Sequence, residues 1–148
     1  MMKQIEEKAI ESFRSGLNCA QAVLTAHADE MGFDNNLALS VSCGFGGGMG
    51  RLQETCGAVT GSFMVLGINN CKKFADNSKR KEETYRMVQK FSEKFNQIHG
   101  TTNCRSLLKC EIKTDEGHRY AKEHNLFETV CEKCILDSIR IIDDLLQK

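Results

Sequence analysis

Apolar residues recur along this chain at spacings of three and four, which places their side chains on one face of an α-helix. Residues 78–99 are the clearest case. Four apolar side chains there share one face: Val88, Phe91, Phe95 and Ile98. A similar stripe runs from about residue 129 to residue 146. No segment shows the strict alternation of a β-strand, so the pattern predicts an all-α fold.

Glycine and asparagine mark the expected ends of the N-terminal helices. The sequence contains no proline, so no helix is interrupted by the geometry of a proline ring. A first helix is expected to end near Gly16, and a second one, capped by Asn18, is expected to end near Gly32. A short third element then covers residues 37–41.

The middle of the chain combines a glycine-rich loop, residues 44–51, with an apolar helix that follows it at residues 56–68. Counted with the helices on either side, these elements predict a bundle of about six helices. At 148 residues the chain has the usual length of one domain and can bury a core without disulfides. We therefore expect residues 1–148 to form a single domain.

Composition and charge argue against several classes of function. Lysine and arginine together number 20, as do aspartate and glutamate, so no basic excess indicates a nucleic-acid partner. No apolar run approaches the roughly 18 residues that a membrane helix needs, and the N-terminus lacks the apolar stretch of a signal peptide. We therefore expect a cytoplasmic protein without membrane insertion.

Eight cysteines are unusual for a chain expected in a reducing compartment. Stable disulfides are rare there, so a cysteine-rich chain more often binds metal or carries out thiol chemistry. The alternative is that individual cysteines fill the core as small apolar side chains. Their positions in the sequence help to separate the two interpretations.

Four cysteines lie at or just after a residue suited to capping a helix: Cys19, Cys56, Cys104 and Cys131. Asn18, Thr55 and Asn103 directly precede the first three. Thr129 and Glu132 predict a capping box that places the fourth in a first helical turn. Unpaired N–H groups and the helix dipole lower the pKa of a thiol at such a position, which makes it reactive and a good metal ligand. If the last helix begins further upstream, the fourth cysteine is instead an interior residue.

The segment ETCGAVTG at residues 54–61, with FGGGMG before it at 45–50, resembles the signature of the C_GCAxxG_C_C family of redox-active proteins. The resemblance covers most of the chain. Cys19 before the motif, and Cys104 and Cys131 after it, occupy the places of the other family cysteines. It implies a helical domain in which four cysteines act together in redox or metal chemistry, often encoded near transporters.

Within the motif, Gly57 and Gly61 lie one helical turn apart. A helix side that carries almost no side chains lets another backbone approach closely. Helix packing and a cofactor site explain this stripe about equally well, so both glycines are candidate cofactor-binding residues. Helices with such a face often pair between subunits, which makes a homodimer a candidate assembly.

Three further cysteines are candidate additions to the site: Cys43, Cys110 and Cys134. Cys43 begins the glycine-rich loop. Cys131 and Cys134 form a CxxC pair, whose members share one face of a helix and have the spacing of a redox dithiol. Together with Cys104 and Cys110 they have the ligand types of a tetrahedral zinc site.

Other features are expected to lie outside the chemistry. Cys71 stands among asparagines and lysines, which is typical of an exposed loop. His27 and His99 lie near predicted helix ends, where we expect them to be solvated. The loop 44–51 lacks the spacing of a phosphate-binding loop, so nucleotide binding through Arg51 is less favoured than a lid beside the site.

Three functions remain open for the four motif cysteines. In the first, which we favour, they hold an iron–sulfur or other metal-thiolate centre and transfer electrons. In the second, they exchange thiols and disulfides without metal, as an oxidoreductase that works with a redox partner protein or a small thiol. In the third, they hold zinc or another soft metal in a module associated with transport. All three require the four sulfurs to converge in the fold.

Overall fold

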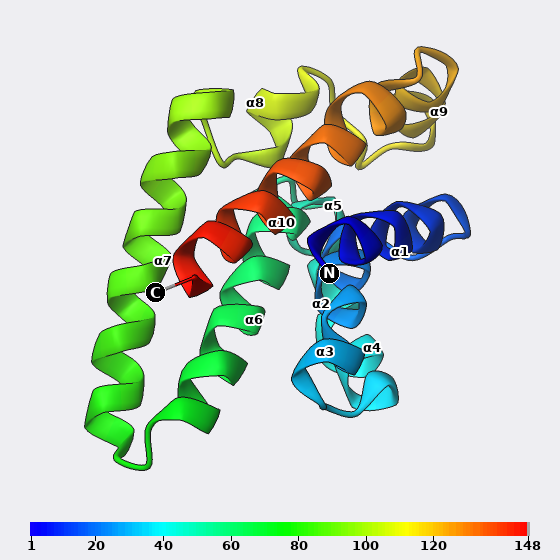
Figure 1. Ribbon diagram of the computed structural model, residues 1–148. Helices are drawn as coiled ribbons and strands as arrows, with labels where there is room; N and C mark the ends of the chain where they lie inside the picture. Colours follow the sequence, from blue (N-terminus) through cyan, green and yellow to red (C-terminus); the bar gives the residue numbers. More distant parts are fainter. Residues whose placement is uncertain (148) are drawn as a thin grey trace.

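The computed structural model describes residues 1–147, and Lys148, the last residue of the expected domain, lies outside them. The regular elements in this range are helices, which confirms the all-α fold (Figure 1). One isolated β-bridge, between Thr55 and Asn103, is the sole β pairing of the described chain.

The N-terminal elements are α1 (Met2–Arg14), α2 (Cys19–Ala26), α3 (Ala28–Met31), α4 (Asn35–Ser42), the 3₁₀-helix η1 (Cys43–Phe45) and α5 (Gly46–Met49). The C-terminal elements are α6 (Gly57–Lys73), α7 (Asn77–His99), α8 (Cys104–Leu108), α9 (Asp115–Glu123), the π-helix η2 (Phe127–Cys131) and α10 (Glu132–Leu146).

The helix count differs from the expected six. Gly47 and Gly48 have φ of 66°, so α5 is not a regular helix, and nine α-helices remain among residues 1–147. The additional ones include α3 and α8, which are only 4 and 5 residues long. A helix of that length completes too few turns for its apolar spacing to be visible in the sequence.

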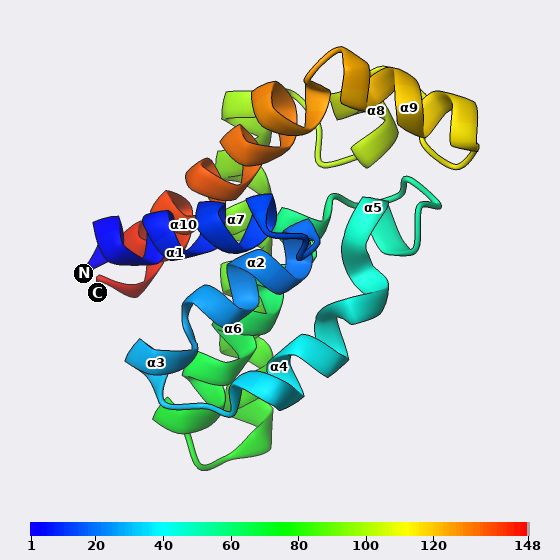
Figure 2. The same cartoon turned by 90° about the vertical axis from the view of Figure 1, so that its right-hand side faces the viewer.

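The main core lies where α2, α6, α7 and α10 meet. Figure 1 shows α6 and α7 as an antiparallel pair crossed by α10, and Figure 2 shows that α1 begins and α10 ends on the same side of the bundle. Phe91 and Phe95 of α7 are fully buried, as are Ile135 and Ile139 of α10. Burial of each such side chain contributes about 1.5–3 kcal/mol, so these members of the predicted apolar stripes hold the helices together. Ile98, which also belongs to the predicted stripe of α7, is 52% exposed instead.

A smaller apolar cluster lies beneath the C-terminal connections. Its buried members are Cys104, Leu108, Ile112 and Ala121. Val130 and Cys131 of η2 contact both this cluster and the main core. The π-helix therefore joins the two apolar regions, and the cysteines lie at that junction.

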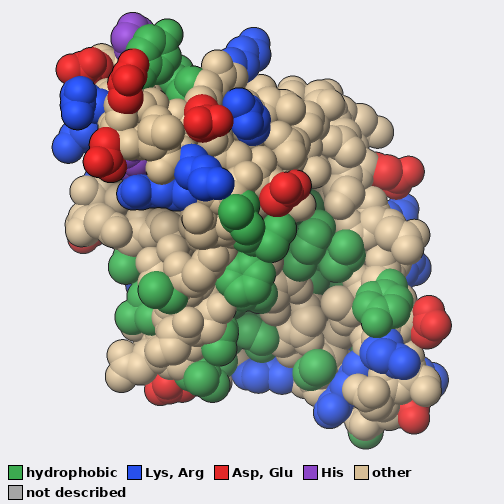
Figure 3. Space-filling model, turned by 180° about the vertical axis from the view of Figure 1, so that it is seen from behind, with side chains coloured by type: hydrophobic (Ala, Val, Ile, Leu, Met, Phe, Trp, Pro, Cys, Tyr) green, Lys and Arg blue, Asp and Glu red, His purple; other side chains and the backbone are tan. Residues whose placement is uncertain are grey.

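The surface carries no dominant charge. Figure 3 shows hydrophobic side chains gathered near the middle of the face seen from behind, with acidic, basic and histidine side chains mixed around α9. None of the helices within residues 1–147 is both long enough and apolar enough to cross a membrane.

Candidate functional site

A short antiparallel pairing brings Cys56 and Cys104 together. The N–H of Cys56 donates to the carbonyl of Thr102 at 2.8 Å, and the N–H of Cys104 donates to the carbonyl of Glu54 at 2.6 Å. These bonds flank the single β-bridge of the described chain. Helices α6 and α8 therefore begin side by side, each with a cysteine at its start.

The glycine face of α6 lets α2 approach. A Cβ placed on Gly61 would lie 2.8 Å from the carbonyl oxygen of Ala20, and one on Gly57 would lie 3.1 Å from the Cβ of Cys19. Neither position has room for a side chain, so these glycines set the distance between the two helices. Cys19, the first residue of α2, consequently lies beside Cys56.

The predicted cap, Asn18, forms a capping box at the start of α2, and Gln21 at the third helical position is its other member. The side chain of Asn18 accepts from the N–H of Gln21 at 2.9 Å, and the side chain of Gln21 accepts from the N–H of Asn18 at 3.1 Å. The Asn18 amide also donates to the carbonyl of Cys43 at 2.9 Å. The same cap thus fixes the start of α2 and the glycine-rich loop.

Cys131 and Cys134 come from the last helix, and the capping box predicted there is wrong. The hydroxyl of Thr129 donates to the carbonyl of Asn125 at 3.1 Å instead of capping a first turn. The chain enters α10 through the π-helix without a break, so Cys131 is an interior residue with φ of −67°. Two hydrogen bonds of 2.9 Å from Arg14 to Glu132 fasten this turn to α1.

Five thiols face one another at this junction. Cys19 hydrogen-bonds with Cys131, and Cys56 hydrogen-bonds with Cys134. The charges of Cys56 and Cys131 both raise the pKa of Cys104. The structure thus brings together the four cysteines singled out from the sequence and adds Cys134. All eight cysteines of the chain are free thiols.

The thiols differ in how easily they ionise. The hydrogen bond from Cys134 lowers the pKa of Cys56, helped by two backbone N–H groups in the first turn of α6 and opposed by burial. The bond to Cys131 and burial raise the pKa of Cys19, and burial raises the pKa of Cys104 to about 12. The lowered pKa predicted at every helix start is therefore wrong for Cys19 and Cys104. The hydrogen bond with Cys131, followed by burial, raises the pKa of Cys19, whereas burial is the main cause for Cys104.

The thiols line one cavity of about 420 Å³. Six cysteines contribute to its wall: Cys19, Cys43, Cys56, Cys104, Cys131 and Cys134. Gly57 also lines it, whereas Gly61 does not and instead packs against α2. Cys110 is half-buried and lies outside the lining.

Gln53 fixes the wall of this cavity. Its side chain is buried, donates to the carbonyl of Cys110 at 2.9 Å and accepts from the N–H of Ile112 at 2.8 Å. It also hydrogen-bonds with Cys104. No pattern in the sequence indicates this role, since a glutamine in a polar loop usually faces solvent.

The residues around these thiols match a known family. A family model described as "Putative redox-active protein (C_GCAxxG_C_C)" matches residues 17–145. The chain belongs to the C_GCAxxG_C_C family. The predicted resemblance is thereby confirmed, and the matched range contains all five of the converging thiols. No curated protein and no solved structure matches the chain.

In this C_GCAxxG_C_C domain, the glycine-rich segment packs as a lid over the motif cysteines. A Cβ on Gly48 would lie 2.6 Å from the Cβ of Cys104, and one on Gly46 would lie 2.3 Å from that of Asn18. Gly48 also has φ of 66°, which L side chains rarely adopt. Close packing against the site thus explains Gly46 and Gly48 in this chain.

Two histidines and one cysteine lie in surroundings that differ from those predicted from the sequence. His27 is buried, and a nitrogen of its ring lies 2.8 Å from the carbonyl of Val23. The ring of His99 packs on Phe95, and its Nε2 lies 2.9 Å from the Asp137 carboxylate. The prediction that both histidines are solvated is therefore wrong. Cys71 is exposed as expected, but it lies within α6 and not on a loop.

The donor atoms of the C_GCAxxG_C_C site suit a soft metal, because all of them are thiols. Within residues 1–147, however, no group of three or more His, Cys, Asp or Glu side chains is arranged to hold a metal ion. The thiols hydrogen-bond with one another in pairs instead, Cys19 with Cys131 and Cys56 with Cys134. As they stand, the side chains are arranged as dithiols.

Proposed function

We propose that this protein is a thiol–disulfide oxidoreductase whose reactive pair is Cys56 and Cys134. The observation that supports it best is the hydrogen bond between these two thiols, which favours the thiolate of Cys56. A thiolate is the nucleophile in disulfide exchange, and a second thiol within reach completes the reaction. Cys56 also lines the cavity, so a small disulfide can approach it.

The reaction proceeds in two exchanges. The Cys56 thiolate attacks one sulfur of a disulfide R–S–S–R, forms a mixed disulfide and releases RS⁻. Cys134 then attacks the sulfur of Cys56, and its proton goes to the second departing RS⁻, which leaves as RSH. One substrate disulfide is reduced to two thiols while Cys56 and Cys134 are oxidised to a disulfide.

The oxidised pair needs a reductant to complete a cycle. A redox partner protein or a small thiol supplies two electrons by the reverse exchange. The neighbouring pair, Cys19 and Cys131, provides a second dithiol in the same wall of the cavity. We place this cycle in a reducing compartment such as the cytoplasm, where the resting thiols stay reduced.

A metal-thiolate centre is the second candidate. It is favoured by the number of cysteine side chains that line one cavity, since four thiolates are the usual complement of an iron–sulfur cluster. Cys19, Cys56, Cys104 and Cys131 would hold such a cluster, or zinc, and a bound cluster would supply one-electron transfer. We rank this candidate below disulfide exchange because the thiols hydrogen-bond in pairs.

A Cys134→Ser variant tests the first candidate. Wild-type protein mixed with bis(hydroxyethyl) disulfide is expected to release two thiols for each internal disulfide that forms between Cys56 and Cys134, and peptide mapping identifies that disulfide. The variant is expected to stop at a mixed disulfide on Cys56, seen as a mass increase, while Cys71→Ser behaves as wild type. If Cys56 stays unmodified in every protein, the proposed exchange does not occur.

Anaerobic purification separates the two candidates. A colourless protein without iron, zinc or acid-labile sulfide that still forms the mixed disulfide supports exchange. A brown protein with stoichiometric iron and sulfide, in which the motif cysteines resist alkylation, supports the cluster instead.

A further inference from the structure

The ionisable side chains that line the cavity, apart from the thiols, are all basic. Besides the cysteines, its ionisable lining residues are Arg51 and His118, and no aspartate or glutamate is among the residues that line it. Arg51 makes no ion pair with any side chain of residues 1–147. A guanidinium without a carboxylate partner is thus available to a ligand at this wall.

The backbone fixes where Arg51 lies. Its φ is 62°, in the left-handed region that few non-glycine residues occupy. A Cβ on Gly47 would lie 2.8 Å from the Cγ of Arg51, so the arginine side chain folds back over the glycine-rich loop. This close approach holds the guanidinium stem against the lid of the cavity.

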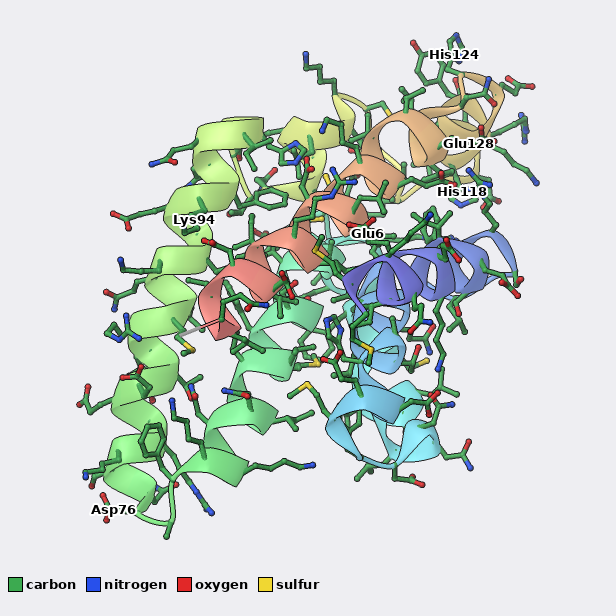
Figure 4. The ribbon with its side chains drawn as sticks, viewed as in Figure 1. Glu6, Asp76, Lys94, His118, His124 and Glu128 are labelled. Atoms are coloured by element: carbon green, nitrogen blue, oxygen red, sulfur yellow. The ribbon has the colours of Figure 1, made fainter. Side chains whose placement is uncertain are left out.

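His118 of α9 also lines the cavity. Figure 4 shows it on the side of α9 that faces α1, and its ring lies 5.3 Å from that of Phe127. Burial and the charge of Arg51 lower the pKa of His118, which shows that the two side chains are close enough to interact. The positive charge at this cavity therefore comes chiefly from Arg51.

Asn18 adds a polar side chain to the lining. The other lining side chains are apolar and come from α1, α8, η2 and the connection after α8: Phe13, Leu107, Leu108, Ile112, Phe127 and Val130. A volume of about 420 Å³ lies in the range of cavities that hold small molecules, which is about 300–1,000 Å³. A low-molecular-weight ligand with an apolar body fits these walls better than a folded partner does.

We propose that the cavity selects small disulfides that carry a carboxylate, and that Arg51 binds this carboxylate while the disulfide lies against Cys56. The proposal rests on disulfide exchange at Cys56 and names its substrate class. Attraction to a guanidinium draws the anion in, and a cationic disulfide finds no carboxylate to receive it.

Three small disulfides of similar length test the selection: dithiodiglycolate, which is anionic, bis(hydroxyethyl) disulfide, which is neutral, and cystamine, which is cationic. The rate at which each disulfide forms a mixed disulfide on Cys56 is measured with Cys134→Ser protein. This rate is divided by the rate at which the same disulfide reacts with a free small thiol. The normalised rates are expected to fall in that order. Added salt is expected to reduce the differences, because it screens exposed charges.

Arg51→Gln and Arg119→Gln form a matched pair of variants. Arg119 is an exposed arginine of α9 that does not line the cavity. Arg51→Gln is expected to lower the ratio of the dithiodiglycolate rate to the bis(hydroxyethyl) disulfide rate about three- to tenfold, and Arg119→Gln is expected to preserve it. A ratio of two rates on one protein is insensitive to partial loss of folding.

The outcomes distinguish failure of exchange from failure of selection. If none of the three disulfides modifies Cys56, disulfide exchange itself is wrong. If all three react at equal normalised rates, or if cystamine reacts fastest, exchange stands and the selection by Arg51 is wrong.

Discussion

The thiol of Cys134 donates a hydrogen bond to the sulfur of Cys56, joining the first turn of α10 to the start of α6. This single contact makes two buried thiols unequal, since it favours the charged form of one and the neutral form of the other. Burial alone would raise the pKa of both. The difference between them is what the chemistry proposed for this site requires.

Alkylation as a function of pH measures this inequality. Cys56 is expected to reach half its maximal rate with iodoacetamide at a lower pH than a free cysteine in solution, whose thiol has a pKa of about 8.5. Cys134→Ala is expected to raise the Cys56 midpoint, because the donor is lost. Rates for each residue come from mass spectrometry between about pH 6 and about pH 10. A wild-type Cys56 midpoint that coincides with that of free cysteine would show that the hydrogen bond does not control ionisation.

The glycines of α6 offer a matched pair of substitutions. Gly61→Ala is expected to destabilise the fold by about 1–3 kcal/mol, because its Cβ would meet the carbonyl oxygen of Ala20 at 2.8 Å. Gly67→Ala adds the same methyl group to the same helix where nothing lies within 4 Å, and it is expected to stabilise the protein by up to about 1 kcal/mol. Urea unfolding measures both, and equal effects would contradict the close approach of α2.

Gln53→Ala tests the support of the cavity wall. The variant leaves the carbonyl of Cys110 and the N–H of Ile112 without their partner, which is expected to cost about 1–3 kcal/mol. Gln97→Ala, at an exposed position of α7, is expected to change stability by less than about 0.5 kcal/mol. Thermal unfolding compares the two, and a neutral Gln53→Ala would mean that these hydrogen bonds do not hold the wall.

Alkaline pH is expected to weaken the fold through Cys104. Burial raises the pKa of this thiol to about 12, whereas an unfolded chain releases the proton near about pH 8.5. The folded state thus binds more protons between these values, so its stabilisation is complete below about pH 8.5 and is lost as the pH rises toward about 12. Cys19 and Cys134 act in the same direction.

The corresponding measurement is the free energy of unfolding in urea at several alkaline pH values. Cys104→Ala is expected to flatten its decline with pH, whereas Cys71→Ala is expected to keep the slope of the wild type. The slope, and not the absolute stability, is the observable, because either substitution also changes packing. An unchanged slope in Cys104→Ala would show that this thiol does not resist ionisation in the folded state.

Features set by local chemistry were predictable from the sequence. Phe91 and Phe95 repeat at helical spacing, so the periodicity alone indicates the buried face of α7. Asn18 caps α2 as expected, because a cap depends only on the next few residues. That Cys19 and Cys56 share one site is an expectation carried by the family resemblance and not by local chemistry, and the structure shows that Gly57 and Gly61 permit the close contact between α6 and α2.

Features set by distant packing were not predictable. The partner of Cys56 proved to be Cys134, although CxxC spacing suggested that Cys131 and Cys134 would pair with each other. Which thiol faces which depends on how α10 crosses α6, and no local pattern encodes that crossing. The burial of His27 and the position of Gln53 have the same origin.

The π-helix at Phe127–Cys131 has a consequence for what insertions and deletions the chain can tolerate. Each residue turns a regular helix by about 100°, and this wider turn holds one residue more than the α-helical register requires. Deleting one residue there would restore regular bonding, yet it would swing Phe127 and everything before it around the axis relative to Cys134. The additional residue of the π-helix thus sets the angle about the helix axis between the Phe127 ring and the Cys134 sulfur. The number of residues in this turn is therefore constrained even where the identity of their side chains is not.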